Sequence, residues 1–332
     1  MNEKVLSVII PVYNAERTID YCLESLIDAN LEGKYEIICV NDGSNDDSLK
    51  KLKKWEEKYL DTIRIIDKAN GGMSSARNIG MKTARGEWLF FCDSDDFIAK
   101  NSMSAIFDFI HSYPKELGLV KFSMKHVKDV ELDEFKGLGE VIFYGSSKDF
   151  LLNHTFWTSW TFLFRRDCIL NSGIEFFDVR GCEDALFNIE FLLKNKVKVL
   201  SIGADVYRYV DNNFSICHTS MSKTSRRYIN DALMVLDRYK ALTPSPETEP
   251  ELYKRMQWVS AKMLPNIFAR LWHTDMSVKE YSDIKRKLKE IQCLPCEFYL
   301  GWKDEIREFL VLHPALFYVF KKILKELKLI KV

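Results

Sequence analysis

The sequence lacks several features that would each mark a class of protein. It has no basic excess, since Lys and Arg together number 48 and Asp and Glu also number 48, and a general nucleic-acid binder needs such an excess to neutralise phosphates. No apolar run reaches the roughly 18 residues that a membrane-spanning helix needs. The apolar start of the chain has no small-residue cleavage pattern, so we expect no secretory signal. The chain is therefore expected in the cytoplasm, without a nucleic-acid partner.

Metal-binding patterns of histidine and cysteine are also missing. The six histidines form no pair at ligand spacing, and Cys293 and Cys296 make a lone CxxC, which provides half of the ligands of a four-ligand zinc site. The eight cysteines are scattered through apolar stretches, which favours reduced thiols in a cytosolic protein over disulfides. Neither residue type predicts a metal site.

Apolar runs and helix-like segments alternate through the first hundred residues. The predicted strands are residues 5–10, 36–40, 62–67 and 87–92. The first strand is predicted to end at Pro11, and Asn14 is the predicted N-cap of the helix that follows; Ser44 or Asn45 is expected to cap the second helix. Such alternation is typical of a mostly parallel sheet flanked by crossover helices, and continuous apolar runs indicate strands buried on both faces.

Polar stretches follow these strands, at the edge where open parallel sheets bind ligands. They are PVYN (11–14), NDGS (41–44), KANGG (68–72) and DSDD (93–96). In NDGS, Asp42 is either a turn residue or a contact to a base or ribose. In DSDD, the three aspartates repel one another unless a cation neutralises them, which favours a Mg²⁺ or Mn²⁺ site. Arg77, near the start of a helix that leaves this edge, is either solvated or a nucleotide contact.

The pattern loosens beyond residue 115. Glu183 and Asp184 stand at a predicted helix start, where the helix dipole keeps carboxylates ionised. They are either a charged helix terminus or the source of a general base, which must be ionised to take a proton from a hydroxyl. The aromatic residues within 156–162 are either core or a sugar-stacking platform.

Beyond about residue 220 the chain is expected to be helical. We predict a catalytic domain of residues 1–218, with a nucleotide-binding half (1–100) and an acceptor half (101–218), followed by a helical region, 219–332. The last stretch, from Arg307, mixes apolar residues with five lysines. It is either a helix packed on the catalytic domain or a peripheral anchor on an anionic membrane surface.

Four stretches, in this order, carry a resemblance to a known family. They are LSVIIPVYN, VNDGSNDDS, GGMSSARNIGMKTARGEWLFFCDSDD and CEDALFNIEFL. Together they resemble the family 2 (GT2) inverting glycosyltransferases of bacterial surface-polysaccharide synthesis. The match is dense over the first hundred residues, looser to about residue 216, and fades in the helical part. It implies an α/β fold of the GT-A type, a mostly parallel sheet flanked by helices, with a helical C-terminal extension.

The resemblance also implies roles for individual residues. Uracil of a nucleotide sugar is held by Pro11, Tyr13, Asp42 and Arg77. The ribose and diphosphate are contacted by Asp93 and Ser94, and Mn²⁺ or Mg²⁺ is bound by Asp95 with Asp93. The general base is Asp184, with Glu183 beside it. Asp96 helps to position donor or acceptor, and Val210 stands where relatives often have arginine, which leaves a diphosphate contact to Arg208 or His218.

The implied function is a metal-dependent inverting transfer of a sugar, a hexose or an N-acetylhexosamine, from a UDP-sugar to a hydroxyl of a saccharide acceptor. The expected products are exopolysaccharide, capsule or O-antigen, with an acceptor that is lipid-linked in related enzymes and a peripheral contact with the cytoplasmic face of the inner membrane. Two alternatives stay open. One is a non-catalytic nucleotide-sugar-binding protein; the other is a sugar-phosphate nucleotidyltransferase, although the Gly-rich phosphate loop it would need after the first strand is missing. No motif encodes the donor sugar, the acceptor or the linkage.

Overall fold

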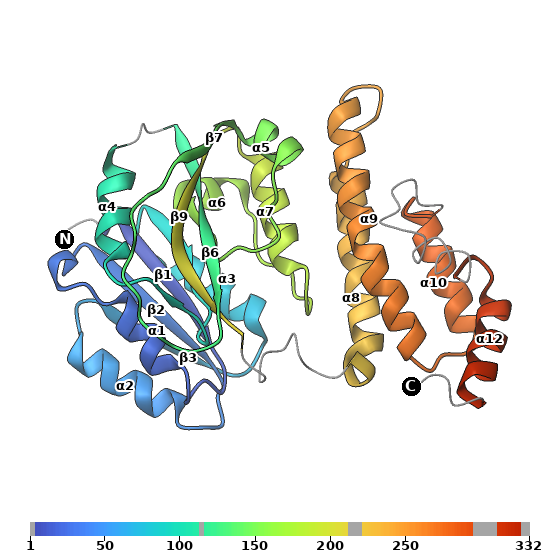
Figure 1. The fold of residues 1–332 in the computed structure, drawn as a ribbon, viewed down its shortest axis with the longest axis horizontal. Helices are drawn as coiled ribbons and strands as arrows, with labels where there is room; N and C mark the ends of the chain where they lie inside the picture. The colour runs from blue at the N-terminus through green and yellow to red at the C-terminus, as the bar shows by residue number, and fades with distance from the viewer. Residues whose placement is uncertain (1–3, 113–115, 212–220, 295–310, 327–332) are drawn as a thin grey trace. The chain divides into compact units, whose positions relative to one another are not determined.

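The computed structural model describes residues 4–112, 116–211, 221–294 and 311–326. The chain divides into two compact units (Figure 1). Unit 1 comprises Met1–Asp178 and Asp184–Asn213, and unit 2 comprises Val179–Glu183 and Phe214–Val332. The short segment Val179–Glu183 thus interrupts unit 1 and ends at the first residue of α7 (Glu183–Lys194), the helix that carries the predicted site residues Glu183 and Asp184.

Unit 1 is built on a nine-stranded sheet in the order β3-β2-β1-β4-β8-β6-β9-β5, with β7 paired to β9. The strands are β1 (Leu6–Val12), β2 (Tyr35–Asp42), β3 (Ile63–Lys68), β4 (Trp88–Phe91), β5 (Phe97–Ile98), β6 (Leu117–Val127), β7 (Val141–Ser146), β8 (Phe162–Arg165) and β9 (Lys198–Val210). Neighbours among β1 to β4 are parallel, as are β6 and β9, whereas β5, β7 and β8 pair antiparallel. The α/β fold class is confirmed, and the wholly parallel part is the N-terminal half.

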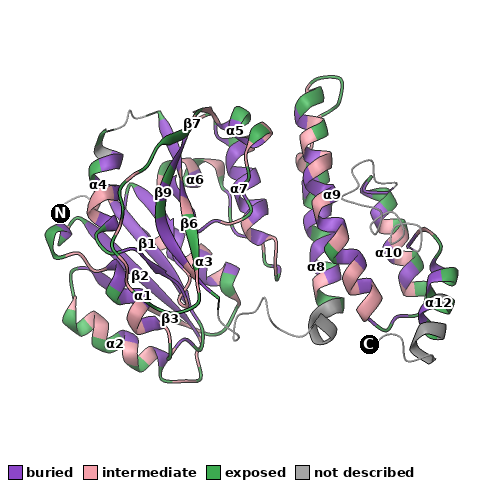
Figure 2. Cartoon of the chain, in the orientation of Figure 1, coloured by how far each residue is buried: buried purple, intermediate pink, exposed green. Residues whose placement is uncertain are grey.

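Helices flank this sheet (Figure 1). They are α1 (Ile19–Leu26), α2 (Ser48–Lys58), α3 (Met73–Thr83), α4 (Ser102–Ser112), α5 (Ser147–Asn153), α6 (Arg166–Ser172) and α7 (Glu183–Lys194), with the short 3-10 helix η1 (Ala29–Leu31). Every residue of β1, β2 and β4 is buried (Figure 2). The continuous apolar runs of these strands are therefore explained by cover on both faces of the sheet.

Three local predictions at the ligand edge were wrong. β1 continues through Pro11 to Val12 because its pairing with β4 ends at Ile9, so the missing N–H of Pro11 breaks no ladder on that side. Asn14 does not cap α1, which begins at Ile19. Its side chain instead accepts a hydrogen bond from the backbone of Asn45 at 2.8 Å and so ties the loop after β1 to the loop after β2.

The second helix also begins later than predicted. α2 starts at Ser48, with Asp47 at the N-cap position, so neither Ser44 nor Asn45 caps it. Ser44 Oγ accepts from the backbone of Asn14 at 3.0 Å. Polar residues that could have capped helices are thus used to join the two loops that border the predicted nucleotide site.

The described residues of unit 2 from 221 onward are mostly helical. Its helices are α8 (Met221–Leu242), α9 (Pro250–His273), α10 (Val278–Glu290) and α12 (Pro314–Glu326). A capping box of Ser277 and Glu280 starts α10, and the Tyr281 hydroxyl donates to the carbonyl of Thr274 at 3.1 Å. Lys321 of α12 is buried and donates to the same carbonyl. Within the described ranges, no helix is both long and apolar enough to cross a membrane.

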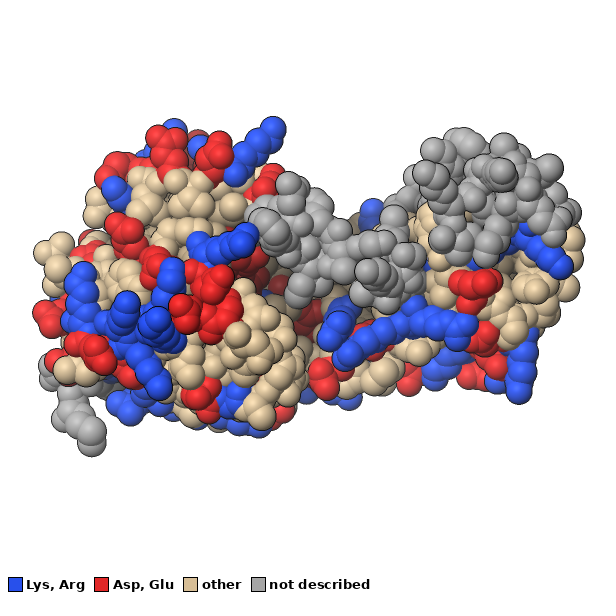
Figure 3. All heavy atoms as spheres, turned by 90° about the horizontal axis from the view of Figure 1, so that it is seen from below, with Lys and Arg blue, Asp and Glu red and all other residues tan. Residues whose placement is uncertain are grey.

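The surface of unit 1 mixes charges of both signs. Figure 3 shows basic side chains lying beside acidic ones over this unit, as the balanced composition leads one to expect. On α2, for instance, exposed Lys50 lies 3.5 Å from Asp47, and Lys51 pairs with Asp20 at 2.5 Å.

Candidate active site

The candidate site lies at the carboxyl ends of the parallel strands. Pro11 is buried near the end of β1, and the Tyr13 ring just beyond it is 50% exposed. Asp42 is the last residue of β2 and is buried. The turn of Asp93 to Asp96 follows β4 after one residue, Cys92. These positions agree with the rule that ligands of open α/β sheets bind beyond the carboxyl ends of the strands.

Asp42 holds the turn between β3 and α3. Its carboxylate accepts hydrogen bonds from the backbone of Gly71 at 2.9 Å and of Gly72 at 2.8 Å, and from the Lys68 ammonium. Gly72 has a φ of +89°, a conformation that residues with a side chain rarely adopt. Asp42 is thus a strand residue that fixes the entry into α3, in a turn other than its own NDGS stretch, and its contact to a nucleotide stays a prediction.

The four residues of the DSDD stretch differ in exposure. Asp93, Ser94 and Asp95 are partly exposed, whereas Asp96 is 1% exposed. The Asp96 carboxylate accepts from the Tyr207 hydroxyl at 2.7 Å and from the backbone of Val210 at 2.8 Å. Burial, with the negative charges of Asp93 and Asp95 close by, raises the pKa of Asp96 to about 8. Asp96 thus binds β9, and the two exposed acids are Asp93 and Asp95.

Arg77 of α3 joins the two acidic stretches of the sequence. Its guanidinium is 1% exposed and donates to Asp93 at 2.7 Å and to Asp184 at 2.8 Å. The Phe176 ring lies 5.1 Å from the guanidinium carbon. The expectation of a solvated arginine is therefore excluded by its burial. The contact between Arg77 and uracil stays a prediction, since the described hydrogen bonds of the guanidinium go to carboxylates.

Two further residues of α3 form hydrogen bonds with the segment that leads to α7. Asn78 exchanges two hydrogen bonds with the backbone of Phe176, at 2.8 and 2.7 Å. Ser74, one turn earlier, donates to the carbonyl of Phe177 at 2.8 Å. These contacts lie on either side of Arg77 in the sequence, and they explain how a residue of α3 reaches an acid 107 positions further along the chain.

Asp184 lies in the first turn of α7, where the helix dipole favours a negative charge. Ser159 donates to its carboxylate twice, from the backbone N–H at 3.1 Å and from Oγ at 3.0 Å. Burial raises the pKa of Asp184 above the ordinary value of 3.8, and Asp93 adds to the rise, while Arg77 and Ser159 oppose it. A carboxylate with a raised pKa is a stronger base than an ordinary aspartate. The side chain remains 14% exposed.

Glu183 has a different environment. It is 5% exposed, and its carboxylate accepts from the backbone of Gly181 at 2.9 Å. The bond closes a tight turn at the start of α7. The two neighbouring acids therefore differ: Glu183 binds its own local backbone, and Asp184 binds Arg77 and Ser159.

Sequence reasoning missed Ser159 and Tyr207. The Tyr207 hydroxyl donates to Asp96 and accepts from the backbone N–H of Asp93 at 3.1 Å. Nothing in the sequence singles out either residue, since each stands in an aromatic-rich stretch that reads as core. Trp160 belongs to the core and not to an exposed sugar-stacking platform, because it is 6% exposed and its ring stacks on that of Tyr207, with 4.4 Å between the ring centroids. Of the aromatic residues in 156–162, Trp157 is the exposed one, at 38%.

Arg208 forms an ion pair with Asp133. It is 1% exposed and binds Asp133 through two nitrogens, at 2.7 and 2.9 Å, which lowers the pKa of Asp133. His218 lies outside the described residues. A diphosphate contact from this part of the chain therefore finds no support in Arg208.

Only some of the acids at this edge of the sheet could bind a hard divalent cation such as Mg²⁺. Among the described residues, no three His, Cys, Asp or Glu side chains converge as a metal site. Mg²⁺ is usually bound by one or two carboxylates, with substrate phosphates and waters completing the shell. Two partly exposed carboxylates, Asp93 and Asp95, fit such a shared shell, and Asp96 does not, because its oxygens are bound to Tyr207 and Val210.

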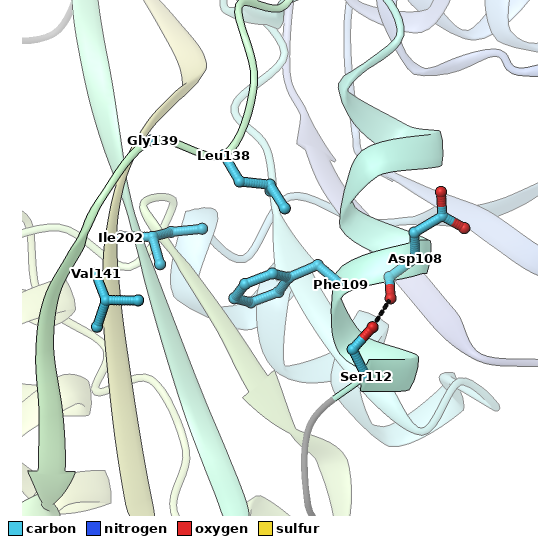
Figure 4. A pocket seen from close by; sticks show the side chains of 7 residues that line it. All are labelled: Asp108, Phe109, Ser112, Leu138, Gly139, Val141 and Ile202. Atoms are coloured by element: carbon cyan, nitrogen blue, oxygen red, sulfur yellow. Dashed lines mark hydrogen bonds between the residues drawn. The ribbon is translucent and has the colours of Figure 1, made fainter.

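A separate pocket of about 350 Å³ lies in unit 1 (Figure 4). Its lining residues are Asp108, Phe109, Ser112, Leu138, Gly139, Val141 and Ile202. The side chains of Phe109, Leu138 and Ile202 point toward one another, and Ser112 Oγ is bound to the carbonyl of Asp108 at 2.7 Å. The pocket is mostly apolar and shares no residue with the candidate site.

Comparison with known proteins gives a consistent picture. The model of the family described as Glycosyl transferase family 2 matches residues 7–169. The chain is 28% identical over 296 residues to the uncharacterized glycosyltransferase EpsJ of Bacillus subtilis, covering 86% of this chain and 83% of that protein. It is 31% identical over 207 residues to the poly(ribitol-phosphate) beta-glucosyltransferase of Bacillus spizizenii, covering 61% of this chain but 32% of that longer protein.

A solved structure shares the fold. The structure of S. aureus TarS 1–349 in complex with UDP-GlcNAc matches with a TM-score of 0.63 at 22% identity, covering 88% of this chain and 82% of that one. The similarity extends over the helical part as well as the sheet, since so much of the chain is covered.

Proposed function

This chain is a glycosyltransferase of family 2, and on that premise we propose that it is a metal-dependent inverting enzyme that moves a sugar from a UDP-sugar to a hydroxyl of a saccharide or polyol acceptor. The alternatives of a nucleotidyltransferase and of a non-catalytic binder are less well supported, because the site keeps both the acids after β4 and a held carboxylate at α7.

One observation supports the proposal: the Asp184 carboxylate is held by hydrogen bonds and is linked through Arg77 to Asp93 of the sheet edge. Arg77 bridges Asp184 and Asp93, and Ser159 fixes the Asp184 carboxylate from a second side. A base for a hydroxyl must be ionised, oriented and partly accessible. Arg77 and Ser159 favour the ionised form, and the 14% exposure leaves a face open.

The chemistry follows from these placements. Asp184 takes the proton of the acceptor hydroxyl as the oxygen attacks the anomeric carbon from the face opposite the diphosphate. One displacement inverts that carbon, so an α-linked UDP-sugar gives a β-glycoside without a covalent intermediate. A divalent cation held by Asp95 and Asp93 would offset the negative charge that develops on the departing diphosphate. Glu183 supports the turn before Asp184 through its bond to Gly181.

The nucleotide is assigned to the loops after β1, β2 and β4. Tyr13 offers a half-exposed ring next to Pro11 for the uracil, and Asp42 with Arg77 complete the predicted uracil site. Asp93 and Ser94 are partly exposed, which leaves them accessible for the proposed contacts to ribose and diphosphate. UDP as the nucleotide is supported by the UDP-GlcNAc that the TarS structure contains.

The acceptor is proposed from the named relatives. The Bacillus spizizenii relative is a poly(ribitol-phosphate) beta-glucosyltransferase, and a Staphylococcus aureus relative is a poly(ribitol-phosphate) beta-N-acetylglucosaminyltransferase. Both names describe β-linked products, as inversion of an α-linked donor requires. We therefore place the acceptor among cell-surface polymers, with glucose and N-acetylglucosamine as the first donors to test.

A peripheral membrane contact is also proposed, on the described part of α12. Leu316, Tyr318 and Val319 are exposed there, and Lys322 is exposed beside them. Apolar and basic residues on one helix suit an anionic lipid surface. The rest of the predicted anchor, before residue 311 and after residue 326, lies outside the described ranges. Liposome flotation tests it: a chain truncated before Arg307 should float less than the full chain, and equal partitioning would reject the contact.

The test of the function is UDP release from a panel of UDP-sugars, with ribitol-phosphate polymer and oligosaccharide acceptors. We expect acceptor-dependent release with Mn²⁺ or Mg²⁺ and little release with chelator. Equal release in chelator would reject the metal, and failure of every donor with every acceptor would reject the transferase assignment in favour of a binding protein.

A further inference from the structure

A buried asparagine lies one turn beyond Asp184 on α7. Asn188 is 1% exposed, and its Nδ2 donates to two backbone carbonyls, that of Phe156 at 2.8 Å and that of Thr158 at 2.9 Å. Because α7 places residues four apart on the same face, Asn188 and Asp184 face the same stretch of chain. That stretch is the loop of residues 156–161, which precedes β8.

The next residue of the loop, Ser159, also binds α7. Ser159, which follows Thr158 directly, is fully buried and donates twice to the Asp184 carboxylate. Its own carbonyl accepts from the backbone of Phe162 at 3.2 Å, and the hydroxyls of Thr158 and Thr161 lie 3.0 Å apart. The loop is thus closed on itself by a turn and fastened to α7 at two levels, first by Asn188 and then by Ser159.

The orientation of the Asn188 amide is determined by its neighbours. Both atoms that it contacts are carbonyl oxygens, which accept and cannot donate, so the nitrogen must face them. In this orientation Oδ1 is buried and has no hydrogen-bond partner among the described residues. An unpaired buried acceptor costs free energy, so the favourable contribution of this amide comes from its two donors.

We propose that Asn188 is a positioning residue for Asp184, acting through Ser159. The inference rests on the proposed role of Asp184 as the base. By fixing two carbonyls of the loop, Asn188 sets the place of the N–H and Oγ donors of Ser159, and these set the orientation of the carboxylate that receives the acceptor proton. The charged groups around that carboxylate are Arg77 from α3 and Asp93 from the turn after β4.

The hydrogen bonds from Ser159 affect the pH dependence of transfer as well as the orientation of the Asp184 carboxylate. Both donors of Ser159 lower the pKa of Asp184. Loosening the loop weakens these bonds, so the pKa of Asp184 rises further. Transfer needs the ionised carboxylate, and the acid limb of the kcat profile therefore moves to higher pH. A residue that merely supports the fold would lower the amount of active protein and leave the position of this limb unchanged.

The test compares Asn188→Leu with Asn195→Leu in the full chain. Leucine is close to asparagine in shape, carries no charge and removes both donors. Asn195, just after α7, is a matched control: it is also buried, and its Nδ2 donates to the Phe191 carbonyl at 3.0 Å, with no bond to the 156–161 loop among those described. For Asn188→Leu we expect kcat to fall about 10- to 100-fold, with an unchanged donor KM and an acid limb at higher pH. For Asn195→Leu we expect the kcat of the wild type and an acid limb at the wild-type pH.

A second variant, Ser159→Ala, removes one donor to Asp184 and leaves the amide contacts in place. It should shift the limb in the same direction by a smaller amount, and it carries the test if Asn188→Leu does not fold. Equal kcat and equal limbs in Asn188→Leu and Asn195→Leu would overturn the inference. A wild type that transfers no sugar would reject the proposed function instead, and amide exchange then decides: faster exchange at residues 156–162 in Asn188→Leu alone supports the positioning network, and unchanged exchange overturns it.

Discussion

The acids after β4 and the acid at the start of α7 look alike in sequence and differ in how they are held. After β4, three aspartates diverge: Asp93 binds Arg77, Asp95 stays partly exposed, and Asp96 is bound by β9. At α7, three donors from two segments converge on the single carboxylate of Asp184. This difference shows that the role of each acid depends on its partners and its exposure. A high density of acids in the sequence indicates where a site lies, but not which acid does what.

Arg77 connects the two regions. It is the buried cation that both Asp93 and Asp184 contact. The single positive charge of the Arg77 guanidinium is paired with both carboxylates. It therefore stabilises the region proposed for the donor and the region proposed for the acceptor proton at once. Substitutions at Arg77 should therefore affect both regions, and substitutions within either acidic region should affect one.

The largest effect is expected from Arg77→Gln. It leaves two carboxylates without their buried cation, and breaking such a pair lowers the free energy of unfolding by about 3–5 kcal/mol. Both UDP binding and transfer should fall with it. Denaturant unfolding measures the stability, with Arg64→Gln as control, since Arg64 pairs with Glu36 at 3.3 Å and is 31% exposed. Equal losses in the two variants would show that Arg77 has no special place between the regions.

An intermediate effect is expected from Asp95→Ala. It removes a partly exposed carboxylate proposed to share a cation with the diphosphate. The affinity for UDP in Mn²⁺ should fall by roughly tenfold or more, a loss typical of damage to a metal site. In chelator the variant and the wild type should bind UDP alike. Calorimetric titration with UDP in both buffers makes the comparison, and an equal loss in chelator would contradict the assignment of Asp95 to a metal.

The smallest effect is expected from Asp96→Asn, one residue further on. An asparagine can still accept from the Val210 backbone and can donate to the Tyr207 hydroxyl, and its side chain would face β9 as that of Asp96 does. UDP affinity in Mn²⁺ should stay near the wild-type value. A loss as large as that of Asp95→Ala would mean that Asp96 also serves the ligand edge.

The sequence was sufficient to locate both acidic regions because each is defined by its neighbours along the chain. A buried strand precedes Asp93, so periodicity puts that region at the predicted ligand edge. A predicted helix follows Glu183 and Asp184, and their interpretation as the source of a base, not only as a charged helix terminus, rests on the family resemblance. The partners could not be located in this way. Arg77 and Ser159 reach Asp184 across 107 and 25 positions, through packing of α3 and of a loop that leaves no local pattern. Asn14 failed as a cap for the same reason, since it binds Asn45 across 31 positions.

The central claim is that Asp184 is the base of a UDP-sugar transferase, and the Asp184→Asn variant tests it most directly. Its transfer rate and its UDP affinity should be measured on one preparation, by product formation and by calorimetry. We predict that transfer falls about 10²- to 10⁴-fold, as expected when a general base is lost, while UDP affinity stays near that of the wild type. Transfer at the wild-type rate, or a loss of UDP affinity as large as the loss of transfer, would contradict the account.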